Sequence, residues 1–315
     1  MTSKSFCPLP WTHLATHPHG SVTLCCESEQ IQRASEARDD PKNFKTLHTE
    51  SYNFNRIHNN DNFNKIRVQM LEGKRPEVCT RCWDKEDAGL DSKRTIDSRK
   101  LNFTEEQARQ ITNEDGSIND VSYEFIELRL GNHCNLACRT CNPISSSRWK
   151  KDWQKAGFDE RLILPQKLMD WPLDSLFWES LEHYVKDLRV LYINGGEPLL
   201  IDKHKDFLYK LVDMGVAKNV EIVYSTNVTI INKEYEDAWK EFRKVQMMLS
   251  LDDVGERNNY VRHLSKWDKV LETFEWLTSL ENVNTNMMCT VSNLNVLYLN
   301  CQYILKTDLN YFFLL

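Results

Sequence analysis

The chain has 315 residues, of which 41% are hydrophobic and 27% charged, and its formal net charge is −6. These values are typical of a globular protein with one large and one smaller domain. The negative net charge argues against general binding to nucleic acids or anionic membranes, although Arg148, Lys150 and Lys151 form a local basic patch. Without a signal peptide or a run of roughly 18 apolar residues, a cytoplasmic protein that spans no membrane is expected.

Residues 1–121 are expected to form a small, loop-rich domain. The segment 27–62 has few apolar residues and many Asn, Asp and Arg. One helix is predicted at 61–72, where apolar residues recur at helical spacing before Gly73. Because this segment offers little apolar material for a core of its own, we expect a metal centre held by cysteines to stabilise its fold.

Residues 122–315 show short apolar runs that alternate with amphipathic helices, a pattern that predicts a parallel α/β sheet, open or closed into a barrel. Only residues 292–315 follow the fifth strand, so a sixth barrel strand is expected to be minimal or absent, as in a truncated barrel. The predicted strands are 123–130, 188–193, 220–225, 245–251 and 283–291, with a short one at 311–315. The predicted helices are 146–155, 174–186, 203–214, 233–244 and 266–280.

A polar motif lies at the C-terminal end of each of the first four strands. In α/β barrels the active site is built at this end, because the loops that follow the strands converge there. We therefore expect the four motifs to face one pocket. They are Cys134-x3-Cys138-x2-Cys141, Gly195-Gly196-Glu197-Pro198, Ser225-Thr226-Asn227 and Ser250-Leu251-Asp252-Asp253.

The three cysteines of the first motif can hold three irons of a [4Fe–4S] cluster. Such a cluster normally takes four cysteines, so three leave one iron open for a cofactor or substrate. Together with the Gly-Gly-Glu motif, this loop resembles that of radical S-adenosylmethionine (SAM) enzymes over roughly residues 122–291. The resemblance implies a partial (βα)6 barrel whose cluster is held by Cys134, Cys138 and Cys141.

The same resemblance implies how SAM is bound and cleaved. Gly195 and Gly196 would bring backbone groups close to the methionine ammonium, and Glu197 would add a carboxylate there. The ribose or methionine part would be contacted by Ser225, Asn227, Ser250 and Asp252. A 5′-deoxyadenosyl radical would then abstract hydrogen from a substrate, with an electron donor such as flavodoxin or ferredoxin.

The early cysteines form a second constellation. Cys7, Gly20 and Cys25 form a C-x12-G-x4-C pattern, and Cys79 and Cys82 follow. This arrangement resembles the twitch and SPASM modules, which bind auxiliary [4Fe–4S] clusters, and implies these four cysteines as ligands. Gly20 suits a tight turn between two short strands. Such modules more commonly follow the barrel, whereas this one precedes it.

Several alternatives stay open. Zinc is the rival metal for the early cysteines, because two separated pairs suit tetrahedral coordination, and Cys26 is the rival of Cys25 as a ligand. Zinc with His133 as a fourth ligand is the rival reading of the three-cysteine loop, but it leaves Gly-Gly-Glu unexplained. A catalytically silent metal-binding interaction protein is the alternative to an enzyme. A nucleotide or small metabolite is the alternative to a peptide or protein substrate, which rests on analogy.

A few single residues carry separate expectations. Thr140 replaces the aromatic residue that is common before the third cysteine in these enzymes, so adenine stacking is not implied. Arg262 is expected to be solvated or ion-paired rather than to reach the SAM carboxylate. Asp252 and Asp253 have a helix cap as an alternative role. Surface positions are expected for His13, His17 and His19, and buried ones for Cys26, Cys289 and Cys301.

Overall fold

The computed structural model describes residues 5–28, 38–40, 43–44 and 51–298 of the chain. Packing divides the chain into two compact units. The first comprises Met1–Leu128 and Asp174–Leu191, and the second comprises Arg129–Leu173 and Tyr192–Leu315. We retain the boundary between residues 121 and 122 as a proposal for the functional domains. Cys301 and the strand predicted at 311–315 lie outside the described residues.

The first unit contains more helix than the sequence analysis predicted. The helix predicted at 61–72 is confirmed as α3, and the Asn60 side chain caps it by accepting a hydrogen bond from the Phe63 N–H. A capping box formed by Ser92 and Thr95 begins another helix. The helices are α1 (Leu9–Thr12), α2 (Phe54–His58), α3 (Asp61–Leu71), α4 (Thr80–Asp87), α5 (Lys93–Lys100), α6 (Glu105–Ile111) and α8 (Ser175–Leu181), and the short strands are β1 (His13–Thr16), β2 (Val22–Thr23), β3 (Arg38–Asp40) and β4 (Asn43–Phe44).

The first unit also has an aromatic core, in which Phe54 of the predicted N-terminal domain packs with rings from residues beyond position 121. Phe54 is fully buried, and its ring lies 6.3, 5.9 and 5.3 Å from the rings of Tyr123, Phe177 and Tyr184. The surface position expected for His13 is wrong, because β1 is buried along its whole length and His13 is 2% exposed. The unit is therefore held by apolar packing as well as by its cysteines.

A buried arginine joins three backbone segments of the first unit. Arg67 is fully buried, and its Nε donates a hydrogen bond to the Pro10 carbonyl oxygen at 2.8 Å. Its two Nη groups donate to the carbonyl oxygens of Gly116 and His58, at 2.8 and 2.5 Å. A buried charge is tolerated only when its donors are hydrogen-bonded, so Arg67 and these carbonyls depend on one another.

The strands predicted within residues 122–291 are confirmed, and they form a mostly parallel sheet. Its order is β2-β1-β5-β6-β7-β8-β9, an open sheet that confirms the partial barrel. The pairs β1–β5, β7–β8 and β8–β9 are parallel, and β2 is antiparallel to β1. The further elements are β5 (Phe125–Leu130), α7 (Lys150–Lys155), β6 (Val190–Gly195), α9 (Asp202–Asp213), β7 (Glu221–Thr226), α10 (Glu236–Lys240), β8 (Lys244–Ser250), α11 (Gly255–Val261), α12 (Trp267–Ser279) and β9 (Val283–Met288).

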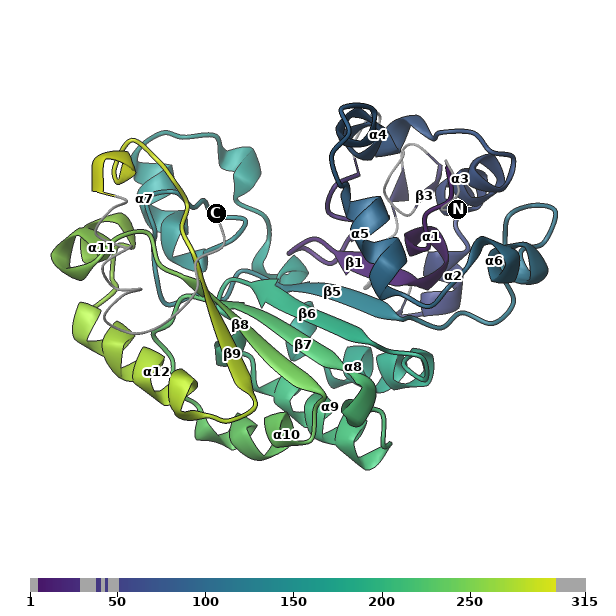
Figure 1. Ribbon diagram of the computed structural model, residues 1–315. Coiled ribbons are helices and arrows are strands. Elements are labelled where there is room, and N and C mark those ends of the chain that lie inside the picture. The colour runs from purple at the N-terminus through teal and green to yellow at the C-terminus, as the bar shows by residue number, and fades with distance from the viewer. Residues whose placement is uncertain (1–4, 29–37, 41–42, 45–50, 299–315) are drawn as a thin grey trace. The chain divides into compact units, whose positions relative to one another are not determined.

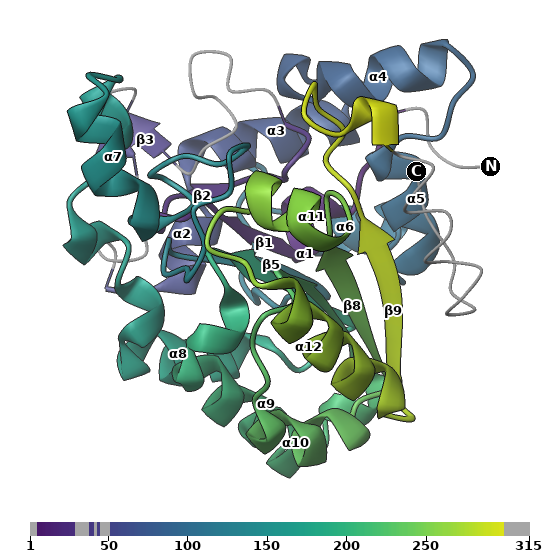
Figure 2. The same cartoon turned by 90° about the vertical axis from the view of Figure 1, so that its left-hand side faces the viewer.

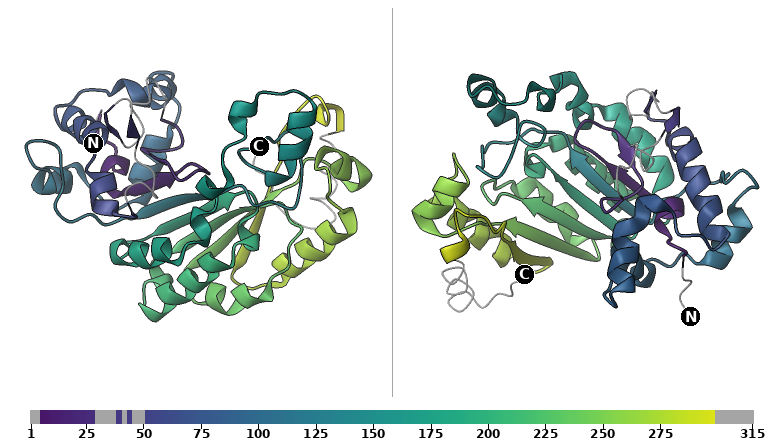
Figure 3. Two further views of the ribbon diagram at one scale, coloured as in Figure 1. Left: turned by 180° about the vertical axis from the view of Figure 1, so that it is seen from behind. Right: turned by 90° about the horizontal axis from the view of Figure 1, so that it is seen from above.

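In the second unit, α9, α10 and α12 cover one face of strands β7–β9 (Figure 1, Figure 2 and Figure 3). Tyr224 of β7 faces these helices, because its ring lies 5.7 Å from that of Trp239 and its hydroxyl 3.2 Å from His204 Nε2. Side chains alternate along a strand, so Ser225 belongs to the opposite face. That face is half-buried along β7 and β8 and leads to the polar loops at the strand ends.

Candidate functional site

The three-cysteine loop follows β5 and is fixed by backbone hydrogen bonds. The Ala137 N–H donates to the His263 carbonyl oxygen at 3.0 Å, and the Arg139 N–H donates to that of Val261 at 2.8 Å. From the other side, the Ser146 hydroxyl donates to the Leu136 carbonyl oxygen at 2.6 Å. The backbone of the loop is therefore held between α11 and the segment that precedes α7.

The thiols of Cys134, Cys138 and Cys141 are half-buried, and two of them lie near side-chain N–H groups. Asn227 Nδ2 is 3.8 Å from Cys134 Sγ, and Arg262 Nη1 is 3.9 Å from Cys138 Sγ. Burial raises the pKa of Cys138 to about 11, and the Arg262 guanidinium opposes this rise. N–H donors favour the charged form of a thiol, which is the form that binds metal.

The two glycines of the second motif allow close approach of two loops. A Cβ on Gly196 would lie 2.2 Å from the His133 carbonyl oxygen, and one on Gly195 would lie 2.6 Å from the Leu130 nitrogen. Gly195 also has a φ of +140°, which favours glycine. The Glu197 N–H then donates to the His133 carbonyl oxygen at 2.7 Å. The Gly-Gly-Glu segment thus lies directly against the cysteine loop.

Glu197 is buried, and its carboxylate accepts several protein hydrogen bonds. Its Oε2 accepts from the Asn227 N–H at 2.7 Å, and its Oε1 accepts from the Thr226 hydroxyl at 2.9 Å and the Leu199 N–H at 3.2 Å. Burial raises the pKa of Glu197 to about 7, and these hydrogen bonds oppose the rise. The carboxylate therefore joins the end of β6 to the end of β7. Its contact with the SAM ammonium remains a prediction.

The other predicted cofactor residues occupy two different environments. Ser225 lies on the half-buried sheet face, where its hydroxyl is 2.8 Å from that of Tyr192, and Ser250 shares this face at the end of β8. Asn227 lies beside Cys134, and its Nδ2 also donates to Asn135 Oδ1 at 2.8 Å. The structure therefore places the second and third motifs beside the cysteine loop, with Ser225 and Ser250 along the sheet face.

Asp252 is fully buried and forms an ion pair with Arg262. Its Oδ2 is 3.0 Å from Arg262 Nε, and its Oδ1 accepts from the Thr290 N–H at 2.8 Å. Arg262 is thus ion-paired, as expected, but it also reaches Cys138. The adjacent Asp253 accepts from the Val254 N–H at 2.8 Å, close to the start of α11. The ion pair places the guanidinium beside the thiol, and no sequence motif signalled that contact.

Within residues 5–28, 38–40, 43–44 and 51–298, no three His, Cys, Asp or Glu side chains converge closely enough for a single metal ion. A cluster does not require such convergence, because each cysteine binds a different iron. The loop supplies three thiols, N–H donors near two of them and an adjacent glycine segment without Cβ atoms. This donor set fits a [4Fe–4S] cluster with one iron left open.

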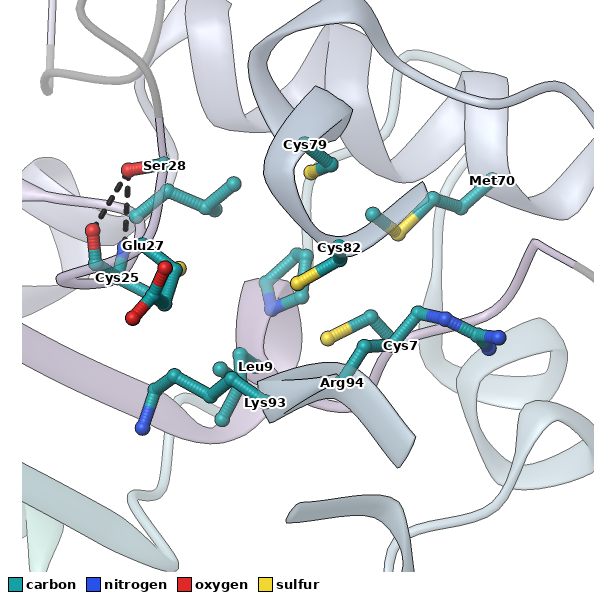
Figure 4. A pocket seen from close by; sticks show the side chains of 12 residues that line it. Cys7, Leu9, Cys25, Glu27, Ser28, Met70, Cys79, Cys82, Lys93 and Arg94 are labelled. Atoms are coloured by element: carbon teal, nitrogen blue, oxygen red, sulfur yellow. Dashed lines mark hydrogen bonds between the residues drawn. The ribbon is translucent and has the colours of Figure 1, made fainter. Parts of the chain in front are cut away.

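The early cysteines surround a cavity in the first unit (Figure 4). Cys7, Cys25, Cys79 and Cys82 all line this cavity, whereas Cys26 does not and is exposed. The expectation that Cys26 is buried is therefore wrong, while Cys289 is half-buried. Burial raises the pKa of Cys25 to about 12 and also raises that of Cys79. Four thiols around one cavity fit the closed ligand set of an auxiliary cluster.

The cavity is built by the hairpin predicted around Gly20. β1 and β2 pair at Ala15 with Thr23, and the turn contains Gly20 at a φ of +80°. Lys93 and Arg94 at the start of α5 also line the cavity. Arg94 Nη1 donates to the Phe6 carbonyl oxygen at 2.7 Å, next to Cys7. Cys25 follows the hairpin, Cys79 lies in the turn before α4, and Cys82 lies in α4 itself.

Two family profiles match the chain, one in each of the predicted domains. The sequence profile of the radical SAM superfamily matches residues 128–296, and that of the iron–sulfur cluster-binding domain SPASM matches residues 7–83. No curated protein matches the chain. No helix in the described part of the chain is long and apolar enough to cross a membrane.

Among solved structures, the chain is similar to Streptococcus suis SuiB. One SuiB structure has a TM-score of 0.43 at 15% identity, covering 80% of this chain and 54% of SuiB. SuiB bound to S-adenosylmethionine has a TM-score of 0.39 at 16% identity, covering 71% and 49%. SuiB bound to the precursor peptide SuiA has a TM-score of 0.39 at 12% identity, covering 78% and 54%. The chain thus spans about half the length of SuiB. With more than half of its residues matched by the superfamily profile, the chain belongs to the radical SAM superfamily and carries an N-terminal SPASM-type iron–sulfur cluster-binding domain.

Proposed function

We propose that this protein reductively cleaves SAM and uses the resulting radical to abstract a hydrogen atom from a peptide or protein. One observation carries the proposal: the Gly-Gly-Glu segment lies directly against a loop of three half-buried cysteines, so that the Glu197 N–H bonds to the residue before Cys134. Cys134, Cys138 and Cys141 would hold the SAM-binding cluster. When bound, that cluster supplies the electron that splits SAM into methionine and a 5′-deoxyadenosyl radical.

The residues around the cysteine loop orient the cofactor and its thiolates. By the family resemblance, Gly195 and Gly196 would bring backbone groups close to the methionine ammonium, and in the structure they let this segment lie against the backbone of Leu130 and His133. Arg262, held by Asp252, favours the thiolate form of Cys138. Glu197 fixes the end of β6 to β7, and its carboxylate adds negative charge near the ammonium when ionised.

The half-buried sheet face is where the ribose of SAM, and the substrate hydrogen atom that is abstracted, are proposed to lie. Ser225 and Ser250 supply hydroxyls on this face for the ribose, and Asn227 supplies an amide beside Cys134. Apolar packing of the opposite face against α9, α10 and α12 keeps these strands rigid, which is how a site excludes water and fixes geometry.

The auxiliary cluster would be held by Cys7, Cys25, Cys79 and Cys82, which line one cavity. A set of four thiolates leaves no open iron, so electron relay or substrate positioning suits it better than SAM binding. A peptide substrate is proposed because relatives that carry SPASM modules often modify peptides or proteins. Flavodoxin or ferredoxin is the proposed electron donor, and the cytoplasm the proposed location.

Anaerobic reconstitution followed by incubation with SAM and dithionite tests the proposal. The wild type should bind about eight irons per chain, as two [4Fe–4S] clusters require, and should form 5′-deoxyadenosine. Cys138→Ala should form none. Stoichiometric zinc without iron, and no 5′-deoxyadenosine, would instead identify a silent metal-binding protein. Iron near four per chain with one zinc would identify zinc at the early cysteines.

A further inference from the structure

A basic surface lies on and around α7 in the second unit. Arg148, Lys150, Lys151 and Lys155 are all exposed, and within the described residues none of the four forms an ion pair. Asp152 is the single acidic residue among positions 148–155. With four cations and one carboxylate, positions 148–155 carry a net charge of +3 in a chain whose net charge is −6. We call these four residues the α7 basic patch.

The α7 basic patch is joined to the three-cysteine loop through a tryptophan. Trp149 Nε1 donates a hydrogen bond to the Cys138 carbonyl oxygen at 2.9 Å. The ring of Trp153 lies 6.2 Å from that of Trp149 and 4.8 Å from that of Phe158, which is 53% exposed. Aromatic residues are enriched at protein interaction surfaces, and these rings lie among the cations of the patch.

The cysteine loop itself adds another cation at its exposed side. Arg139, between Cys138 and Cys141, is exposed, and its guanidinium lies 4.1 Å from the ring centre of the exposed Tyr260. Thr140 beside it is exposed as well. One side of the loop therefore faces the glycine segment and Asn227, and another side presents Arg139 to solvent.

We propose that the α7 basic patch, with Arg139, is the docking surface for an acidic one-electron carrier protein that reduces the cluster held by this loop. The inference rests on the proposed function, because reductive cleavage consumes one electron per SAM. In the step, one electron leaves the reduced carrier and enters the cluster, the carrier is oxidised by one electron, and no proton is transferred. The carrier is identified by its negative surface charge and low potential.

An electron carrier fits this surface better than an acidic peptide substrate does. A substrate must present a hydrogen atom to the half-buried sheet face that carries Ser225 and Ser250, whereas an electron needs to reach only the cluster. The contacts of the patch run to the cysteine loop through Trp149. Electron-transfer encounters also use small interfaces, and charge complementarity steers them and sets their association rate.

The test is a charge reversal, Lys150→Glu with Lys151→Glu, compared with Lys218→Glu with Lys266→Glu. The control changes the net charge equally at exposed lysines of the second unit outside the patch. Fully reduced flavodoxin is the probe, and stopped-flow absorbance measures the second-order rate constant of cluster reduction. The patch variant should react about tenfold more slowly at low salt, because two attractions become repulsions. The difference should shrink as salt screens it, and the control should stay within about twofold of wild type.

Dithionite separates this inference from the proposed function. With dithionite, the wild type and both variants should form 5′-deoxyadenosine at similar rates, and their iron contents should agree. If the wild type forms none with either reductant, the proposed function fails. If the wild type forms 5′-deoxyadenosine with dithionite, but flavodoxin reduces the patch variant as fast as the control variant, the docking surface is refuted. The proposal is also overturned if the patch variant loses affinity for an acidic peptide while its reduction rate is unchanged.

Discussion

Replacing Gly196 with alanine tests how the cysteine loop and the Gly-Gly-Glu segment depend on one another. The added Cβ would lie 2.2 Å from the His133 carbonyl oxygen and 2.8 Å from the Asn132 carbonyl carbon. Both contacts are with backbone, so the cysteine loop itself must move. Overpacking of this kind costs about 1–3 kcal/mol. We expect the variant to lose that much stability and to bind the SAM-site cluster incompletely.

The matched control is Gly215→Ala in the same unit. Gly215 has a φ of +71° but nothing within 4 Å of an added Cβ, so this change introduces backbone strain of about 1 kcal/mol without a clash. Urea unfolding followed by tryptophan fluorescence gives the stability of the metal-free proteins, and iron analysis gives cluster content. Gly215→Ala should bind about eight irons per chain, and Gly196→Ala closer to four. Full iron content and wild-type stability in Gly196→Ala would refute the reasoning.

Three further predictions concern single residues. Burial raises the pKa of Glu197 to about 7, so the metal-free protein should lose about 3 kcal/mol of stability from this group as the pH rises from about 4.5 to 7. Glu197→Gln should lack that component, and identical pH slopes in urea unfolding would contradict the prediction. Arg67→Met leaves three buried carbonyl oxygens without their donors and should lower the free energy of unfolding by about 3–5 kcal/mol. The control Arg99→Met, at an exposed arginine, should lower it by less than about 1 kcal/mol. Equal urea midpoints for the two variants would contradict this prediction. Cys25→Ala should remove the auxiliary cluster and Cys26→Ala should not, as iron analysis would show; retention of about eight irons in Cys25→Ala would contradict the assigned ligand set.

The sequence predicted the second unit well because short strands with apolar residues alternate regularly with amphipathic helices along this part of the chain. Residues 221–226 and 244–250 pair in parallel where the pattern predicted strands, and the open sheet confirms the partial barrel. The early pattern also predicted an auxiliary iron–sulfur module, and the SPASM match confirms the module. The ligand and cofactor roles of individual residues remain predictions, although the structure brings three of the four motifs together.

The first unit was harder to predict because its signals are local and polar. Helices α4, α5 and α6 have only seven or eight residues each, and capping boxes rather than long apolar periodicity mark the starts of α5 and α6. His13 packs against Phe125 and Arg67 bonds to Pro10, and no pattern in a short window of sequence contains such distant contacts. Tertiary packing therefore decided what local propensity could not.

In the site itself, the sequence supplied residue types but not their partners. Gly196 was predicted to admit a methionine ammonium, and the structure adds that it also avoids the His133 carbonyl oxygen. Arg262 was predicted to be ion-paired, and its contact with Cys138 depends on the position of α11 relative to the cysteine loop. Trp149 also bonds to the same loop, because its Nε1 donates to the Cys138 carbonyl oxygen. Such contacts require three-dimensional placement.

The central claim is that an iron bound by no protein thiolate accepts SAM at the loop of Cys134, Cys138 and Cys141. Electron paramagnetic resonance of the reduced, reconstituted full chain before and after addition of SAM measures this directly. We predict that SAM shifts the g-values of one of two cluster signals, and that the shift is absent in Cys138→Ala. Two signals whose g-values are both unchanged by SAM, or a shift that is still present in Cys138→Ala, would contradict the account.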